Sequence, residues 1–127
     1  MLFRSGKIEA SLPGEIKIDP KFEFYDFEAK YLDNATTVLV PANIKRSEDI
    51  QAAAIEAFKA LGCSGLARVD FFYTDDDQII INELNTAPGF TSTSVYPKLW
   101  AVSGLSYTEI ITALIETAQR RTNSVLN

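Results

Sequence analysis

The segments GLARVDFFYT (residues 65–74) and QIIINELN (residues 78–85) stand on either side of a short acidic run, residues 75–77. Both segments are rich in the β-branched and aromatic residues that favour strands, and the run between them is too polar to continue either one. The spacing predicts an antiparallel β-hairpin whose turn centres on Asp76 and Asp77. This hairpin decides where the polar residues of its two strands meet.

Side chains two residues apart in a strand share a face, so Arg68 and Asp70 point the same way. The same alternation predicts one shared face for four residues of the second strand: Ile79, Ile81, Glu83 and Asn85. With the predicted turn, Asp70 lies opposite Glu83 and Arg68 lies opposite Asn85. Because directly opposed Cβ atoms are about 4.5–5.5 Å apart, these four residues form one patch.

Two carboxylates that face each other repel, and such a pair holds either a proton or a cation. Oxygen-only ligands suit Mg²⁺ or Mn²⁺, and Mg²⁺ commonly adds phosphate oxygens of a substrate to one or two carboxylates. The patch therefore predicts a metal site for nucleotide phosphates. The alternative is a solvated hairpin face with a cross-strand Arg–carboxylate pair, worth about 0.2–1 kcal/mol. The apolar runs around the patch favour the metal site, because a partly buried carboxylate pair without a cation is costly.

The segment TAPGFTSTS (residues 86–94) leaves the second strand and leads into a predicted helix near Ser94. Gly89 permits a tight turn and lets the backbone N–H approach a ligand closely. The four hydroxyl residues that follow, together with the N–H groups of a helix start, predict a site for a carboxylate or a developing oxyanion. The alternative is an ordinary Ser/Thr-rich helix cap.

The remaining elements are strands and helices without strict alternation, which favours an α+β fold. Residues 1–19 predict two short strands or a hairpin with a break at Pro13 and Gly14. Residues 20–36, PKFEFYDFEAKYLDNAT, predict a long ordered loop of the kind that carries function. Residues 37–42 predict a strand that Pro41 stops.

Three helices are expected, over residues 47–62, 94–103 and the segment after Ser106. Ser47 is predicted to cap the first helix and Gly62 to end it, and Ser106 with Glu109 forms a capping box for the last. Apolar spacing predicts the buried positions of the first helix: Ile50, Ala54, Ala57, Phe58 and Leu61. The same spacing predicts those of the last: Ile110, Ile111, Leu114, Ile115 and Ala118.

The composition of the 127 residues suits one globular domain, with 46% hydrophobic and 23% charged residues. A net charge of −5 argues against a nucleic-acid partner, and no apolar run is long enough to span a membrane. The chain has no histidine, which excludes catalysis by histidine and zinc sites built on histidine. The single cysteine, Cys63, is expected to be a packing residue.

Four blocks of sequence resemble the C-terminal portion of the D-alanine–D-alanine ligase family, enzymes of the ATP-grasp superfamily. The blocks are SLPGEI (11–16), FYDFEAKY (24–31), GLARVDFF (65–72) and NELNTAPGFTSTS (82–94). The resemblance implies that residues 1–127 form the C-terminal part of an ATP-grasp domain, an antiparallel sheet with flanking helices. It covers nearly the whole chain, in the family's order and spacing.

The resemblance also implies roles for ten residues. Asp70, Glu83 and Asn85 resemble the ligands of two Mg²⁺ or Mn²⁺ ions. Arg68 is similar to the arginine that steadies the acyl phosphate, and Gly89 to the backbone donor of an oxyanion hole. Ser94 and Val95 resemble the contacts of the second D-alanine. Lys30 resembles a phosphate-binding lysine, Tyr31 a tyrosine that closes over the substrates, and Phe72 a residue near adenine.

The implied function is an ATP-dependent ligase that joins two D-alanines through an acyl phosphate, for peptidoglycan precursors. The implied setting is a homodimer in the bacterial cytoplasm, with ATP and D-alanine as partners and neither a nucleic acid nor a membrane. Lys30 and Tyr31 favour a dipeptide product over D-alanyl-D-lactate.

The family's N-terminal domain and the first part of its ATP-binding region have no counterpart in this sequence, so we expect a fragment with little or no activity. Two alternatives stay open: a non-catalytic domain that binds divalent cations or serves assembly, and another ATP-grasp carboxylate–amine ligase.

Overall fold

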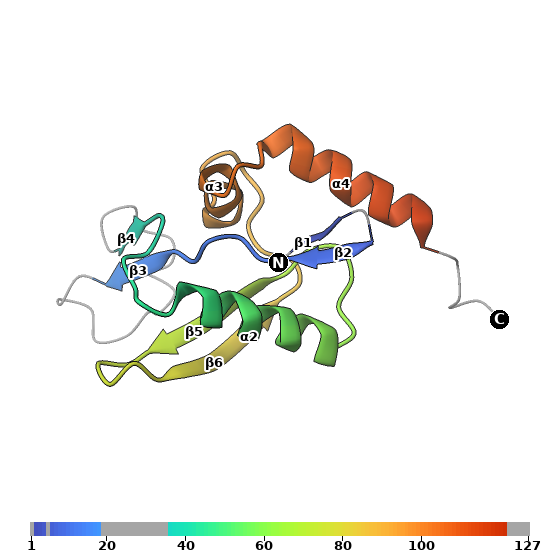
Figure 1. Ribbon diagram of the computed structural model, residues 1–127. Coiled ribbons are helices and arrows are strands. Elements are labelled where there is room, and N and C mark those ends of the chain that lie inside the picture. Colours follow the sequence, from blue (N-terminus) through green and yellow to red (C-terminus); the bar gives the residue numbers. More distant parts are fainter. Residues whose placement is uncertain (1, 5, 19–35, 122–127) are drawn as a thin grey trace.

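The computed structural model describes residues 2–4, 6–18 and 36–121, which form an α+β fold (Figure 1). Strands pair antiparallel: β1 (Leu2–Arg4) with β2 (Lys7–Glu9), β3 (Glu15–Ile18) with β4 (Thr36–Leu39), and β5 (Arg68–Tyr73) with β6 (Ile79–Asn85). The helices of these ranges are α2 (Ser47–Ala60), α3 (Val95–Val102) and α4 (Tyr107–Arg120). The predicted α+β class is confirmed, with the described strands arranged as three separate pairs.

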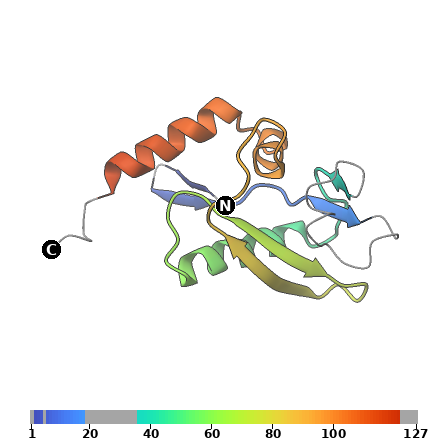
Figure 2. The same ribbon diagram turned by 180° about the vertical axis from the view of Figure 1, so that it is seen from behind.

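The β1–β2 pair lies between two layers of the molecule. Figures 1 and 2 show α2 along the β5–β6 hairpin on one side of it, and α3 and α4 on the other. The predicted break at Pro13 and Gly14 falls directly before β3 begins. The turn between β1 and β2 lies at Gly6, whose φ is +81°. Within the described ranges, no helix is long and apolar enough to cross a bilayer.

Helix α2 ends as predicted but begins one residue earlier than predicted. Gly62, with φ +61°, ends it: the Gly62 N–H donates to the Lys59 carbonyl and the Cys63 N–H to the Phe58 carbonyl, both at 3.0 Å. The prediction that Ser47 caps the helix is wrong, because Ser47 is its first helical residue and Arg46 occupies the N-cap.

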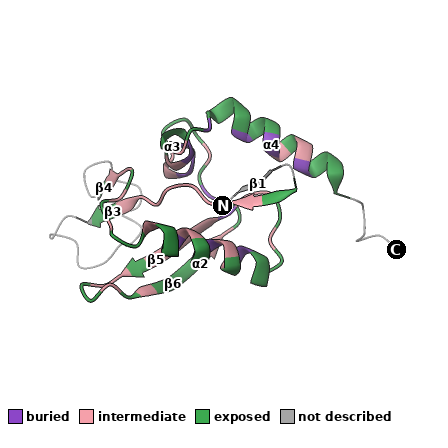
Figure 3. Ribbon diagram, viewed as in Figure 1, coloured by how far each residue is buried: buried purple, intermediate pink, exposed green. Residues whose placement is uncertain are grey.

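The first core cluster joins α2 to the hairpin and contains Ala54, Phe58 and Ala67. Figure 3 shows buried stretches on α2 beside the hairpin. Cys63 packs against it, as expected of a packing residue. The prediction that Leu61 is buried is wrong: it is 67% exposed, since the helix ends at Ala60 and Leu61 turns off its apolar face.

The second cluster joins α3 to α4 and contains Tyr96, Trp100, Leu105, Ile110 and Ala113. The capping box of Ser106 and Glu109 is confirmed. The predicted apolar face is partly wrong: Ile110 is buried, but Ile111 and Ile115 are 37% and 53% exposed. The buried positions of α4 are Ile110, Ala113 and Thr117, a set rotated around the helix from the predicted one.

The segment between β2 and β3 runs close to α3, and Gly14 makes this approach possible. A Cβ on Gly14 would lie 2.7 Å from Leu99 Cδ2 and 3.4 Å from the Leu39 carbonyl oxygen. Ser103 strengthens the same contact, because its hydroxyl accepts the Leu12 N–H at 2.8 Å.

Gly14→Ala is expected to lower the free energy of unfolding by about 1–3 kcal/mol, because the new methyl group must displace the Leu99 side chain. Urea unfolding of Gly14→Ala, Leu99→Ala and the double variant measures this coupling. The double variant should lose less than the sum of the two single losses. Strictly additive losses would contradict the contact.

Candidate functional site

The hairpin turn has three residues, not the two that were predicted. The Asp77 N–H donates to the Thr74 carbonyl at 3.0 Å, and the Thr74 N–H donates to the Gln78 carbonyl at 3.1 Å. Asp77 has φ +61°, the left-handed conformation that closes such a loop. The turn therefore centres on Asp76, and Tyr73 pairs with Ile79.

A β-bulge restores the predicted pairing at the other end of the hairpin. Phe71 pairs with Ile81, but Asp70 pairs with Glu83, so β6 carries one extra residue at Asn82. From there on the prediction is confirmed: Asp70 lies opposite Glu83 and Arg68 opposite Asn85.

The same bulge makes the predicted common face of β6 wrong. Ile81 shares the side of Phe71, whereas Glu83 and Asn85 share the side of Asp70 and Arg68. Val69, Phe71 and Leu84 pack against the first core cluster, to which α2 contributes Ala54 and Phe58. The polar patch therefore lies on the hairpin face that points away from α2.

Arg68 and Asp70 form a bidentate ion pair along β5. Arg68 Nε lies 2.7 Å from Asp70 Oδ1 and Arg68 Nη2 lies 2.8 Å from Asp70 Oδ2. The cross-strand distance from Arg68 Nη2 to Glu83 Oε1 is longer, 3.9 Å. The side chains of Arg68 and Asp70 are 24% and 23% exposed, and that of Glu83 is 51% exposed. This pair within one strand was not foreseen from the sequence, which indicated only a cross-strand contact.

The donor atoms of the patch fit a hard cation. Each carboxylate oxygen offers about two acceptor positions, so both Asp70 oxygens keep one after the contacts with Arg68. Asn85 Oδ1 accepts the Ala87 N–H at 2.9 Å and likewise keeps one. In the described ranges no group of three Asp, Glu, His or Cys side chains gathers as a metal site. A cation here would therefore draw on Asp70, Glu83, the Asn85 amide and oxygens of a ligand.

The loop after β6 folds back on itself at the start of α3. Ser94 occupies the N-cap of α3, but its hydroxyl accepts the Thr91 N–H at 3.0 Å and contacts Thr91 Oγ1 at 2.8 Å. Gly89 lies close to the Ser94 hydroxyl, since a Cβ on Gly89 would be 3.1 Å from Ser94 Oγ. Val95 begins α3, so the helix predicted over residues 94–103 is confirmed.

Apolar side chains border the patch on its turn side. Phe72 pairs with Ile80, and the two are 59% and 51% exposed. This exposed apolar pair adjoins the carboxylates of the patch. The two other residues with predicted site roles, Lys30 and Tyr31, and the loop at residues 20–35 lie outside the described residues.

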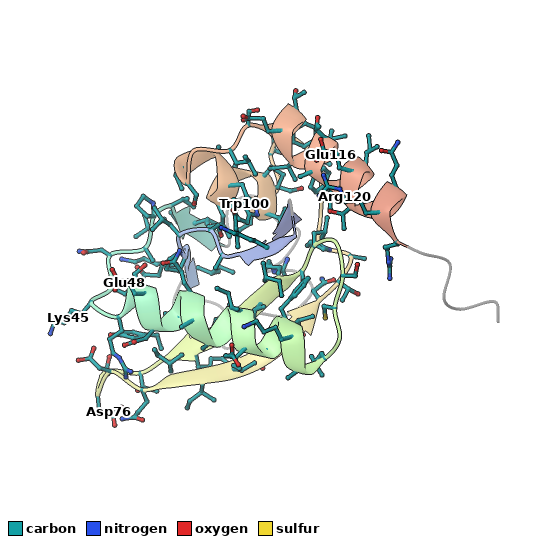
Figure 4. All side chains as sticks on the ribbon, turned by 45° about the vertical axis from the view of Figure 1, so that its right-hand side comes forward. Lys45, Glu48, Asp76, Trp100, Glu116 and Arg120 are labelled. Carbon is teal, nitrogen blue, oxygen red and sulfur yellow. The ribbon has the colours of Figure 1, made fainter. Side chains whose placement is uncertain are left out.

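The tip of the hairpin is tied to the start of α2 by Arg46. Its guanidinium donates to Asp49 Oδ2 at 2.7 Å and to the Asp77 carbonyl at 2.8 Å. The Tyr73 hydroxyl donates to Asp77, which raises the pKa of Tyr73. Figure 4 shows Asp76 at this tip, at the same end of the molecule as Lys45 and Glu48.

A residue with no predicted role, Tyr107, also contacts the loop. Its hydroxyl donates to the Phe90 carbonyl at 2.9 Å from the first turn of α4. The sequence carried no signal for this contact, because the partner is a backbone atom 17 residues away.

Comparisons with known proteins agree on one family. A family model described as "D-ala D-ala ligase C-terminus" matches residues 2–116. A protein of Oceanobacillus iheyensis named D-alanine--D-alanine ligase is 55% identical over 118 residues, which make up 91% of this chain and 32% of that protein.

Two solved structures are similar as well. The D-alanine-D-alanine ligase from Coxiella burnetii has a TM-score of 0.70 and 42% identity, over 87% of this chain and 28% of that one. The Bacillus anthracis D-alanine--D-alanine ligase complexed with ATP has a TM-score of 0.60 and 33% identity, over 66% of this chain and 30% of that one. The chain spans about a third of the length of the curated relatives it matches.

Proposed function

Because this chain belongs to the D-alanine–D-alanine ligase family and has the C-terminal part of its ATP-grasp fold, we propose that it works in an ATP-dependent ligase that joins two D-alanines. The observation that carries the proposal is the register of the hairpin. It sets Asp70 against Glu83 and Arg68 against Asn85 on an open face, directly before the loop at Gly89 and Ser94.

In the proposed reaction, ATP phosphorylates the carboxylate of the first D-alanine. The amine of the second D-alanine then attacks the acyl phosphate and phosphate leaves. Arg68 steadies the negative charge of the acyl phosphate and of the tetrahedral intermediate. Its planar guanidinium is oriented for this by its two bonds to Asp70.

The metal part of the proposal assigns Asp70, Glu83 and Asn85 as the ligands of two Mg²⁺ or Mn²⁺ ions. When bound, the ions supply positive charge that offsets the charge of the transferring phosphoryl group. Arg68 holds both Asp70 oxygens in place for this role. The oxygen-only donor set supports the choice of a hard cation.

The loop after the hairpin is proposed to bind the second D-alanine. The Gly89 backbone N–H serves as a donor to the developing oxyanion, Ser94 binds the carboxylate, and Val95 contacts the methyl side. Gly89 suits this role because it is exposed and carries no side chain to block approach.

Three further residues complete the proposed site. Phe72 packs near adenine, for which its 59% exposure beside Ile80 is suited. Lys30 contacts phosphate and Tyr31 closes over the substrates, which keeps water from the acyl phosphate. Both of these roles rest on the family resemblance alone.

The wider setting belongs to the same proposal: a homodimer in the bacterial cytoplasm that makes a peptidoglycan precursor. The 127 residues alone are expected to be inactive, because they span about a third of the relatives' length.

A second candidate function is a non-catalytic domain. The observation that favours it is the bidentate Arg68–Asp70 pair, which already neutralises one of the two carboxylates.

ADP release tests the two candidates. The chain is assayed with ATP, Mg²⁺ and D-alanine, alone and together with the N-terminal two-thirds of the Oceanobacillus iheyensis relative. We expect release only in the mixture and only with D-alanine. D-lactate, D-serine and L-alanine in place of D-alanine separate this ligase from other ATP-grasp carboxylate–amine ligases. Silence in every mixture would favour the non-catalytic domain.

A further inference from the structure

The peptide unit between Phe90 and Thr91 is held at both of its ends. The Tyr107 hydroxyl donates to the Phe90 carbonyl at 2.9 Å, and the N–H of the same unit, that of Thr91, donates to Ser94 Oγ at 3.0 Å. A peptide unit is planar and turns as one rigid body. The bond from Tyr107 at the carbonyl therefore fixes the direction in which the Thr91 N–H points.

Tyr107 is itself well placed to act as an anchor. It is the first residue of α4, next to the capping box of Ser106 and Glu109 that fixes the start of this helix. Its ring lies against Phe90 with centroids 5.1 Å apart, and Phe90 packs on the α3–α4 core. Tyr107 itself is 38% exposed, so what anchors its hydroxyl is the contact of its ring with Phe90 and its place at the fixed start of α4.

The bond accepted from Thr91 determines what the Ser94 hydroxyl has left to offer. A serine hydroxyl has one hydrogen to donate and two acceptor positions. Ser94 Oγ accepts the Thr91 N–H and lies 2.8 Å from Thr91 Oγ1. When Thr91 Oγ1 donates in that contact, both acceptor positions are filled and the Ser94 hydrogen is left for a third group. A substrate carboxylate is such a group, since it only accepts hydrogen bonds.

We propose that Tyr107 is a positioning residue for the second D-alanine: through the Phe90–Thr91 peptide it orients the Ser94 hydroxyl toward the substrate carboxylate. This inference rests on the proposed function for the identity of the ligand. The positioning of the loop itself does not depend on that function.

The first test measures the loop without any substrate. Tyr107→Phe removes the hydroxyl and keeps the ring. We expect amide hydrogen exchange at Thr91, followed by NMR, to accelerate roughly three- to tenfold, the effect of one lost hydrogen bond. Tyr73→Phe is the matched control, because it removes a hydroxyl that bonds Asp77 at the far end of the hairpin. An equal exchange rate of the Thr91 amide in Tyr107→Phe and Tyr73→Phe would overturn the inference.

The second test uses the ligase mixture described above. Tyr107→Phe should raise the KM for the second D-alanine roughly three- to tenfold and leave kcat and the KM for ATP within about twofold, the pattern of lost ground-state binding. Tyr73→Phe should change none of these. A purely structural role of Tyr107 would lower thermal stability without this selective change in KM, and that result would overturn the inference.

Thr91→Val covers the case in which Tyr107→Phe fails to fold. It removes the hydroxyl whose donation to Ser94 Oγ the inference requires, so the KM for the second D-alanine should rise in the same way. An unchanged KM in this variant would count against the inference. If no mixture has ligase activity, the proposed function fails, and the exchange measurement still decides whether Tyr107 holds the loop.

Discussion

Glu83→Gln is expected to lower D-alanine-dependent ADP release on the order of 100-fold or more. Glu83 lies opposite Asp70, and the substitution keeps its size while it removes one of the two negative charges that would hold a cation. Charge stabilisation by a bound metal is worth several kcal/mol at a transferring phosphoryl group, and each 1.36 kcal/mol is about a factor of ten in rate. The measurement is ADP release in the mixture with the N-terminal portion of the relative.

Glu56→Gln is the matched control for this prediction. Glu56 lies on α2 in an exposed pair with Lys59, and its side chain is 74% exposed. Its neutralisation should leave ADP release within about twofold of the wild type, because the patch lies on the hairpin face that points away from α2. The fold should also be unaffected, because exposed ion pairs contribute little to stability. Equal rates for Glu83→Gln and the wild type would contradict the metal assignment. A Mn²⁺ titration of the wild type and of Glu83→Gln then shows whether the patch binds a cation at all.

Phe58→Ala is expected to lower the free energy of unfolding by about 3–5 kcal/mol. Phe58 is fully buried in the cluster between α2 and the hairpin, so its truncation leaves a cavity there. The loss is a large fraction of the roughly 5–15 kcal/mol that stabilises a domain. Equilibrium urea unfolding measures it, with the slope m checked for constancy.

Leu61→Ala, three residues further along, is the control. Its side chain is 67% exposed, so the substitution should change the free energy of unfolding by no more than about 0.5 kcal/mol. The apolar spacing of the sequence predicts that both residues are buried on one face of α2. The two variants therefore show whether the stability loss follows this spacing or the burial observed in the structure. A loss at Leu61 as large as that at Phe58 would contradict the observed end of α2.

The pairing of the site residues was predicted correctly only because two departures from the predicted hairpin cancel each other. The observed turn has three residues and not the predicted two, and by itself it would shift every pair of the hairpin by one residue from the prediction. The bulge at Asn82 cancels that shift, so Asp70 faces Glu83 as expected. The correct pairing thus depended on two features, the left-handed Asp77 and the bulge, and neither was read from the sequence.

The sequence by itself determined the features that depend on local backbone chemistry. The Gly62 terminus and the Ser106–Glu109 box were both predictable, because each is a set of hydrogen bonds within a few residues. The α+β class followed from strands and helices that do not strictly alternate along the chain. The types of donor atom in the patch were likewise present in the sequence.

Tertiary structure alone decided which apolar faces are buried and which polar groups meet. Ile111 and Ile115 fit the helical period as well as Ile110 does, and only the packing of α4 on α3 and the neighbouring segments selects Ile110 for the core. The Arg68–Asp70 fork depends on side-chain geometry within one strand, and the Tyr107–Phe90 bond joins a side chain to a distant carbonyl. Residue spacing gives the direction of a side chain from its own element, but it does not specify which other element lies there.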